Sequence, residues 1–169
     1  MKITKQLIVN ASVQRLWEIM ATQFADVSYW ASNVDASRGR KNKPHLQGSS
    51  YSGRVCETSM GTFTETLLVY DVQAKKLAYD AKGDKMPFFV KGLQNHWTFT
   101  PLTADKCRVE MEMTISLLPV FNILMGGMMR TQMNSVINQT VEELSYFAEN
   151  GVPHPNKLKA QKNLQMKGA

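Results

Sequence analysis

The sequence predicts an α+β domain: a curved antiparallel sheet of seven strands grips a long C-terminal helix, with two short helices after the first strand. Three observations support this fold class. From residue 51 onward, apolar and polar side chains alternate repeatedly, which is typical of antiparallel strands with one face toward water. Residues 120–148 instead carry apolar side chains at helical spacing over about seven turns. Residues 10–30 carry the signals of short helices.

The N-terminal segment predicts a strand followed by a helix start. Over residues 2–10, Ile3, Leu7 and Val9 fall on one face at a period of two. Ser12 then offers a hydroxyl that caps a helix N-terminus. We therefore expect the strand to end and a helix to begin at this point.

The next segments are shorter and their signals are weaker. We expect a helix over 12–24, a second short helix or turn over 24–30, and a weak strand at 31–40. Residues 41–50 are rich in Pro, Gly, Ser and charge and predict a loop.

Five further strands follow, joined by short turns. They are expected at 51–56, 61–69, 75–82, 93–100 and 107–117. The side chains expected on the covered face of the sheet are Tyr51, Gly53, Val55, Phe63, Glu65, Leu67, Val69, Leu77, Tyr79, Ala81, Leu93, Asn95, Trp97, Phe99, Cys107, Val109, Met111, Met113, Ile115 and Leu117.

The long helix needs a broad apolar surface, because burial of such a face supplies most of a helix's stability. Its stripe consists of Met125, Met129, Met133, Ile137, Val141 and Leu144. Methionine suits both plain core packing and contact with an exchangeable ligand, and both interpretations stay open for the N-terminal half. Residues 136–148 are expected to be ordinary core.

Two adjacent glycines, Gly126 and Gly127, interrupt this helix pattern. Each costs about 1 kcal/mol relative to alanine. A kink, close packing against the sheet or a flexible first turn would each explain them. With Pro119, Phe121 and Leu124 nearby, we consider a gate over a cavity mouth.

A cavity follows from the widths of the elements. Strands lie about 4.8 Å apart and a helix is about 10–12 Å across, so one helix cannot cover a seven-stranded sheet. The short helices, large aromatic side chains or a ligand must fill the remaining space.

The net charge of +6 does not indicate a nucleic-acid-binding protein. Residues 1–150 carry 16 Lys and Arg against 14 Asp and Glu, and the remaining excess comes from four lysines after residue 151. The charge therefore belongs largely to a basic tail, residues 151–169, which we expect to be flexible and separate from the domain at 1–150. Its Leu158 and Leu164, with Lys159 and Lys162, could make weak contact with anionic lipid or a partner.

The cysteines and the N-terminus indicate a cytoplasmic location. Cys56 and Cys107 fit neither a disulfide framework nor a metal spacing. The N-terminus lacks the apolar run of a signal peptide. The most apolar stretch, at 115–129, is shorter than the ~20 residues of a membrane span. The oligomeric state is not predicted.

The order of these elements resembles a known superfamily over nearly the whole chain to about residue 151. The pattern is carried by GTFTETLLVYDVQAKKLAYDAKG, then MPFFVKGLQNHWTFTPLTADKCRVEMEMTISL, then the long amphipathic helix. It is similar to the START-like, helix-grip (SRPBCC) superfamily of polyketide cyclase/dehydrase and lipid-transport proteins. The resemblance implies a seven-stranded sheet around the C-terminal helix with a hydrophobic cavity between them. It does not imply one chemistry, because members bind varied ligands and only some are enzymes.

Glu65 is the candidate catalytic residue. It lies between Phe63 and Leu67 on the predicted apolar face, where an unpaired carboxylate is costly. It is expected to act as a general acid/base or to anchor a polar group of a ligand. The alternatives are a structural partner for Arg54 or a tyrosine hydroxyl, or an outward register.

A small polar cluster is expected around this carboxylate. If the strands pair in sequence order, Tyr51, Glu65, Tyr79 and Asn95 face one side of adjacent strands, as in a ligand site with few polar groups on an apolar wall. Further candidate ligand contacts, for which plain core packing is the alternative, are Trp17, Trp30, Trp97, Val109, Met111, Met125, Met129 and Met133.

The sequence predicts no metal and no cofactor. The three histidines, His45, His96 and His154, lack metal-ligand spacing, and no phosphate loop or nucleophile elbow is present. The predicted function is binding or transport of a small hydrophobic molecule such as a lipid, quinone or polyketide. An aromatase/cyclase- or dehydratase-type enzyme using Glu65, and a partner-binding module with a filled core, are the alternatives.

Overall fold

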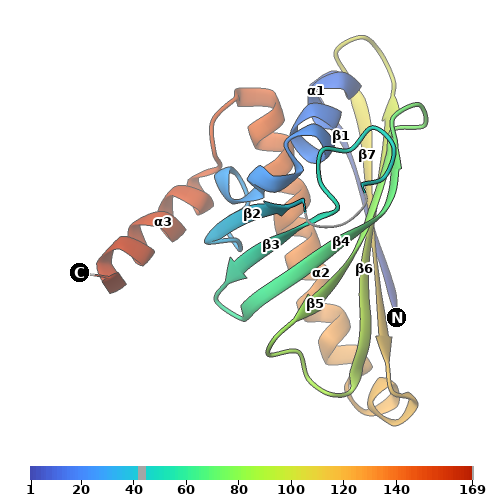
Figure 1. Cartoon of the computed structure of the whole chain (residues 1–169), viewed down its shortest axis with the longest axis vertical. Helices are drawn as coiled ribbons and strands as arrows, with labels where there is room; N and C mark the ends of the chain where they lie inside the picture. Colours follow the sequence, from blue (N-terminus) through green and yellow to red (C-terminus); the bar gives the residue numbers. More distant parts are fainter. Residues whose placement is uncertain (42–44, 169) are drawn as a thin grey trace.

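The computed structural model describes residues 1–41 and 45–168 of the chain. Positions 42–44 of the loop expected at 41–50 therefore lie outside the described residues, as does the last residue. The described part forms the predicted α+β fold, a curved sheet with a long helix along its concave side (Figure 1).

Over residues 1–41 and 45–168, one seven-stranded sheet contains all the strands, and every neighbouring pair is antiparallel. Strands β2 to β7 lie beside one another in chain order, and β1 joins the free edge of β7. Across the sheet the order is β1 (Lys2–Val9), β7 (Cys107–Leu117), β6 (Val90–Pro101), β5 (Lys76–Gly83), β4 (Gly61–Asp71), β3 (Gly53–Thr58) and β2 (Ala36–Arg40).

The connection after β1 covers part of the concave face that the long helix leaves open. It consists of α1 (Val13–Trp17), the π-helical turn η1 (Glu18–Thr22) and the 3-10 segment η2 (Phe24–Tyr29). The Ser12 hydroxyl accepts a hydrogen bond from the Arg15 amide at 3.2 Å and caps α1, as expected. Leu16 and Phe24 are fully buried, so these short elements supply core as well as cover.

The long helix α2 (Pro119–Asn150) divides into two halves by burial. Its C-terminal half contributes Ile137, Val141 and Leu144 to the core, each with at most 1% exposure. The described side chains of its N-terminal half are half-buried or exposed. The C-terminal half is therefore the packed part of the gripped helix.

The predicted face of Tyr51 is wrong. In the observed register Arg54 lies directly opposite Glu65, and both side chains line the cavity. Because side chains alternate along a strand, Tyr51, three residues before Arg54, faces away from the cavity. The Tyr51 ring packs instead over Gly39 of β2, where an added Cβ would lie 2.2 Å from Tyr51 Cε1. The charge of Arg54 favoured an outward side chain, but its partner Glu65 allows it to be buried.

The predicted face of Val69 is also wrong. The register of β4 against β5 shifts between Leu67 and Val69, so Val69 is 39% exposed. The shift turns Tyr70 inward, where its ring lies 5.2 Å from that of Trp17. A bulge of this kind reverses the alternation beyond it.

The segment predicted as a flexible tail is a helix, α3 (Pro155–Gly168). Gly151 ends α2 in a left-handed conformation at φ 72°, and α3 then runs away from the sheet (Figure 1). Its first turn is docked, because Lys157 is 1% exposed and its Nζ donates a hydrogen bond to the Val34 carbonyl at 2.7 Å. Within residues 1–41 and 45–168, no helix has the length and apolarity needed to span a bilayer.

Candidate functional site

A cavity of about 130 Å³ lies between the concave face of the sheet, the η1–η2 segment and the middle of α2. Its wall is largely apolar, with Trp30, Trp97, Met111 and Met133 among the lining side chains. The titratable groups among its described lining residues are Arg54, Cys56, Glu65 and Tyr79. The site is thus an apolar chamber with a few polar groups on its sheet side.

The central polar feature is an ion pair between neighbouring strands β3 and β4. Arg54 Nε donates to Glu65 Oε2 at 2.5 Å, and the side chains are only 5% and 12% exposed. The guanidinium also donates to the Phe24 carbonyl at 2.8 Å. It lies 4.1 Å from the ring centre of Phe24 and 5.1 Å from that of Tyr79. Arg54 is therefore fixed on several sides, as a buried charge requires.

This arrangement determines the protonation of the groups around it. Burial alone would lower the pKa of Arg54, but the nearby Glu65 carboxylate and the Tyr79 phenol raise it, so the net pKa lies above its ordinary value. Burial raises the pKa of Cys56 to about 12 and raises that of Tyr79. At neutral pH the site therefore presents a cationic Arg54, a neutral thiol and a neutral phenol.

Asn95 supplies an unoccupied acceptor in the cavity wall. It is 6% exposed, lines the cavity and lies opposite Tyr79 on the neighbouring strand. Its Oδ1 is buried and has no hydrogen-bond partner in the described part of the protein. The Tyr79 hydroxyl meanwhile accepts from Trp97 Nε1 at 3.4 Å. Because buried polar atoms are rarely left unpaired, this carbonyl is the clearest place for a polar group of a ligand.

A second cavity of about 160 Å³ adjoins the first. Both are lined by Met60, Phe63, Leu93 and Met133, and the second extends to the β5–β6 loop and Met129. An apolar route therefore leads from the Arg54–Glu65 pair toward the N-terminal half of α2.

A buried carboxylate holds one wall of the chamber to α2. Glu143, 1% exposed, accepts hydrogen bonds from the Ser32 amide at 2.7 Å and the Ser32 hydroxyl at 2.6 Å. Gln139 Nε2 donates to the Ser32 hydroxyl oxygen at 2.5 Å and to the Glu143 carboxylate at 3.1 Å. The adjacent Asn33 and Val34 line the cavity, so this cluster positions the segment before β2.

The structure brings together seven of the twelve predicted ligand contacts in the first cavity and one more in the second. Those in the first are Trp30, Glu65, Tyr79, Asn95, Trp97, Met111 and Met133, and Met129 lines the second.

Four predicted contacts, Tyr51, Trp17, Val109 and Met125, lie outside both cavities. Tyr51 has the opposite phase, as described above. Trp17 packs against Tyr70 and Phe99, and Val109 is core at 1% exposure. Met125 lies on α2 before the turns that reach the cavity. The sequence could not separate core from lining residues, because both are apolar at the same spacing.

Fourteen residues that line the first cavity were not among the predicted contacts, and they include Arg54, Cys56 and Thr140. Arg54 did enter the prediction as a possible structural partner of Glu65, and the observed ion pair is that arrangement. Cys56 lies two residues after Arg54 on β3, so its side chain faces the cavity as well. Thr140 had no sequence signal, because it is a polar residue beside the apolar stripe of α2. Over the part of the chain that the structure describes, no three His, Cys, Asp or Glu side chains gather in a way that could hold a metal ion.

Comparison with known proteins identifies related folds. The model of a family described as polyketide cyclase/dehydrase and lipid transport matches residues 1–145. A START superfamily protein from Mycobacterium smegmatis is 15% identical, with a TM-score of 0.70 over 88% of this chain and 97% of that one. A protein from Nitrosospira multiformis is 18% identical, with a TM-score of 0.66 over 89% and 98%.

An enzyme shares the fold as well. Norcoclaurine synthase from Thalictrum flavum, in complex with dopamine and hydroxybenzaldehyde, is 15% identical, with a TM-score of 0.57 over 87% of this chain and 85% of that one. A search of curated protein sequences found no match. At these identities the structural likeness concerns the fold alone.

Proposed function

Since the chain belongs to the polyketide cyclase/dehydrase and lipid-transport family, we propose that it is a carrier that binds a small hydrophobic molecule in its internal cavity. The ligand is a compact apolar body with one hydrogen-bond donor. The observation that carries this proposal is the buried, unpartnered Asn95 Oδ1 in a largely apolar chamber.

The size of the cavity limits the ligand. An apolar cavity of about 150 Å³ accommodates a benzene ring, and the first cavity has about 130 Å³. Together with the adjoining 160 Å³, the space suits a ligand of one or two rings or a short acyl chain. Among lipid, quinone and polyketide-like ligands, the sizes favour the small ring compounds.

The polar groups define how the ligand is oriented. A ligand hydroxyl or N–H donating to Asn95 Oδ1 would satisfy a buried acceptor, whereas a ligand without a donor would leave it unpaired. Leaving such a group unsatisfied costs about 1–3 kcal/mol. Arg54 and Glu65 satisfy each other, so they favour a neutral ligand over a charged one.

An enzyme that uses Glu65 for acid/base chemistry is the alternative. The presence of Glu65 in the cavity wall and the shared fold with norcoclaurine synthase favour it. The ion pair with Arg54 favours a structural role for the carboxylate. For an enzyme, Glu65→Gln would abolish turnover while ligand affinity largely survives. A filled-core module is disfavoured by the cavity itself.

Binding of 2-naphthol, a two-ring probe with one hydroxyl donor, tests the proposal. We expect its fluorescence to report saturable binding, with about 5- to 100-fold higher affinity than 2-methoxynaphthalene, which lacks the donor. The variant Asn95→Leu should remove this preference. Equal affinity for the two probes in the wild-type protein would contradict the assigned role of Asn95.

Two threonines of α2 provide a matched pair of variants. Thr140 lines the cavity and Thr131 is exposed, and each donates a hydrogen bond to the carbonyl four residues earlier. Thr140→Phe should fill the chamber and abolish probe binding, whereas Thr131→Phe should leave it unchanged. Thermal unfolding of both variants checks that the fold is kept. Undiminished binding by a folded Thr140→Phe protein would rule out this cavity as the site.

A further inference from the structure

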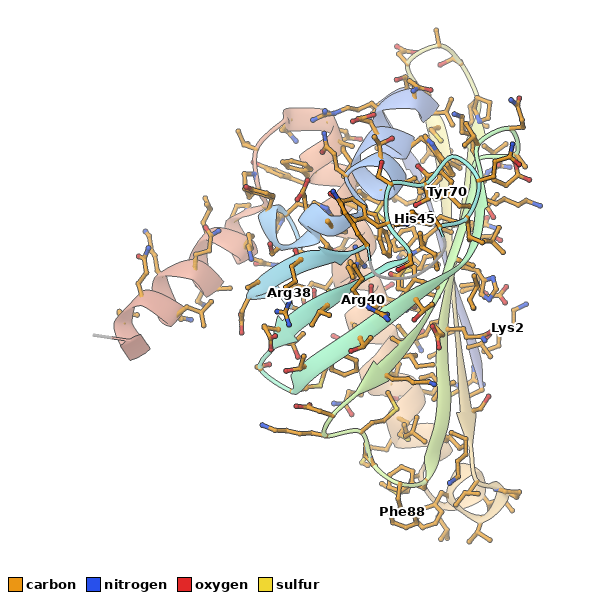
Figure 2. All side chains as sticks on the ribbon, in the orientation of Figure 1. Lys2, Arg38, Arg40, His45, Tyr70 and Phe88 are labelled. Atoms are coloured by element: carbon orange, nitrogen blue, oxygen red, sulfur yellow. The ribbon has the colours of Figure 1, made fainter. Side chains whose placement is uncertain are left out.

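One end of the molecule carries a concentrated group of exposed apolar side chains. We call it the apolar tip. Its members, with exposures of 63% to 85%, are Phe88, Val120, Ile123, Leu124 and Met128. Figure 2 shows Phe88 at the end of the molecule where α2 begins.

The tip is one continuous surface made by two segments. Val120, Leu124 and Met128 are spaced four residues apart on α2, so they form a stripe along one side of the helix. Phe88 belongs to the loop between β5 and β6, and its ring lies 5.4 Å from that of Phe121 at the start of α2. Side chains of this size are normally buried, and a group of them exposed together marks an interaction surface.

The charges around the tip identify the kind of surface it fits. Exposed Lys85 precedes Phe88 in the same loop, exposed Lys91 lies at the start of β6 just after it, and exposed Arg130 lies two residues after Met128 on α2. Residues 119–141 contain no acidic residue. The carboxylate of Asp84 accepts a hydrogen bond from the Thr62 amide. An apolar centre with a basic rim is complementary to a bilayer that exposes anionic headgroups over an acyl region.

The tip also adjoins the route to the ligand cavity. Lys85, Met86 and Pro87 of the same loop, with Met129 of α2, line the second cavity. That cavity shares Met133 and Phe63 with the chamber that holds the Arg54–Glu65 pair. A membrane seated on the tip would therefore lie beside the second cavity, which adjoins the ligand chamber.

We propose that the apolar tip docks the protein on the surface of an anionic phospholipid membrane. This inference concerns membrane binding and not the cavity ligand, and vesicle binding can be measured without adding any cavity ligand. Failure of either idea therefore leaves the other intact.

Flotation with vesicles tests the docking. We expect the protein to float with vesicles of phosphatidylcholine and phosphatidylglycerol, and to do so weakly with phosphatidylcholine alone. The double variant Ile123→Ser/Leu124→Ser should lose this binding. Ile8→Ser is its control, because Ile8 is 57% exposed on β1 and pairs with Arg108 at the other end of the sheet.

Charge reversal tests the basic rim separately. Lys85→Glu/Lys91→Glu should raise the lipid concentration needed for half-maximal binding about tenfold or more, since each lysine near an anionic surface contributes about 1 kcal/mol. Lys76→Glu/Lys106→Glu is the matched control. Both lysines are exposed and lie at the end of the sheet away from the tip, Lys76 at the start of β5 and Lys106 in the turn between β6 and β7.

Site-specific labelling reports insertion directly. Both native cysteines are buried, so Ile123→Cys can be labelled selectively with an environment-sensitive fluorophore. Its emission should shift to shorter wavelength when anionic vesicles are added. The same label introduced by Ile8→Cys should not respond.

Three results would overturn the proposal. The first is absence of flotation, or flotation that the tip variants leave unchanged. The second is loss of binding by Lys159→Glu/Lys162→Glu in α3 as complete as that by the tip variants, because the helical tail would then be the lipid contact. The third is conversion of a dimer to a monomer by Ile123→Ser/Leu124→Ser in the absence of vesicles, because a second copy would then cover the tip.

Discussion

Among single residues, Arg54 and Glu65 have the greatest effect on what the cavity can do. Their side chains form one ion pair in an apolar wall, and the Phe24 carbonyl and the rings of Phe24 and Tyr79 hold the guanidinium in place. Removing one member of a buried pair leaves the other charge without compensation, whereas removing both leaves an apolar site. The pair is therefore expected to behave as a unit.

A double-mutant cycle measures this coupling. Arg54→Met and Glu65→Leu should each lower the free energy of unfolding by about 3–5 kcal/mol. The double variant should cost much less than the sum of the two. Urea unfolding of the four proteins gives the values. Additive costs would mean that the two side chains contribute independently and that the pair is not a structural unit.

The sequence allowed Glu65 to be placed correctly, because Phe63 and Leu67 flank it at a period of two. The same rule failed for Tyr51, since the phase of β3 depends on its register with β4 and not on its own composition. It also failed for Val69, because the register shift after Leu67 occurs among apolar residues, with no glycine or other turn residue that would predict it. Strand periodicity gives the two faces, but long-range pairing decides which face is covered.

At the scale of elements, α2 performs two tasks along its length. Its C-terminal half packs against the sheet, while the N-terminal half lines the second cavity with Met129 and exposes Leu124 and Met128. Gly126 and Gly127 lie in the N-terminal half. A Cβ at Gly127 would meet no atom within 4 Å outside its local helix, so close packing does not explain this glycine.

Substitution of Gly127 tests its role in helix stability. Gly127→Ala should stabilise the protein by about 1 kcal/mol, which corresponds to a rise in Tm of about 2–4 °C. Gly53→Ala is the contrasting variant, because its Cβ would lie 2.0 Å from the Glu65 carbonyl oxygen, and it should lower Tm. A lowered Tm for Gly127→Ala would show that this turn needs a conformation that alanine disfavours.

The elements were predicted unequally well. The stripe of α2 was long enough to define the helix from its spacing alone, and Ser12 marked the start of α1. The helix α3 was not predicted, because its leucines are few and its lysines suggested a solvated chain. Its first turn is docked through a hydrogen bond from Lys157 to the Val34 carbonyl, and no local pattern indicates this contact.

For the whole molecule, the cavity results from the mismatch between a seven-stranded sheet and one helix. The sequence predicted that mismatch from element widths. It could not predict how much space the η1–η2 segment and the aromatic side chains would fill, nor that Asn95 would keep a free acceptor, since both depend on packing in three dimensions. The remaining space is small and apolar with one free polar atom.

Native mass spectrometry of the purified full-length protein, followed by organic extraction, tests the cavity most directly. We predict an added mass that corresponds to a neutral compound of one or two rings or a short acyl chain with a hydroxyl or N–H donor. The added mass should be absent from Thr140→Phe and present in Thr131→Phe. A wild-type protein that carries no such compound and does not bind 2-naphthol, while remaining folded, would contradict the carrier function.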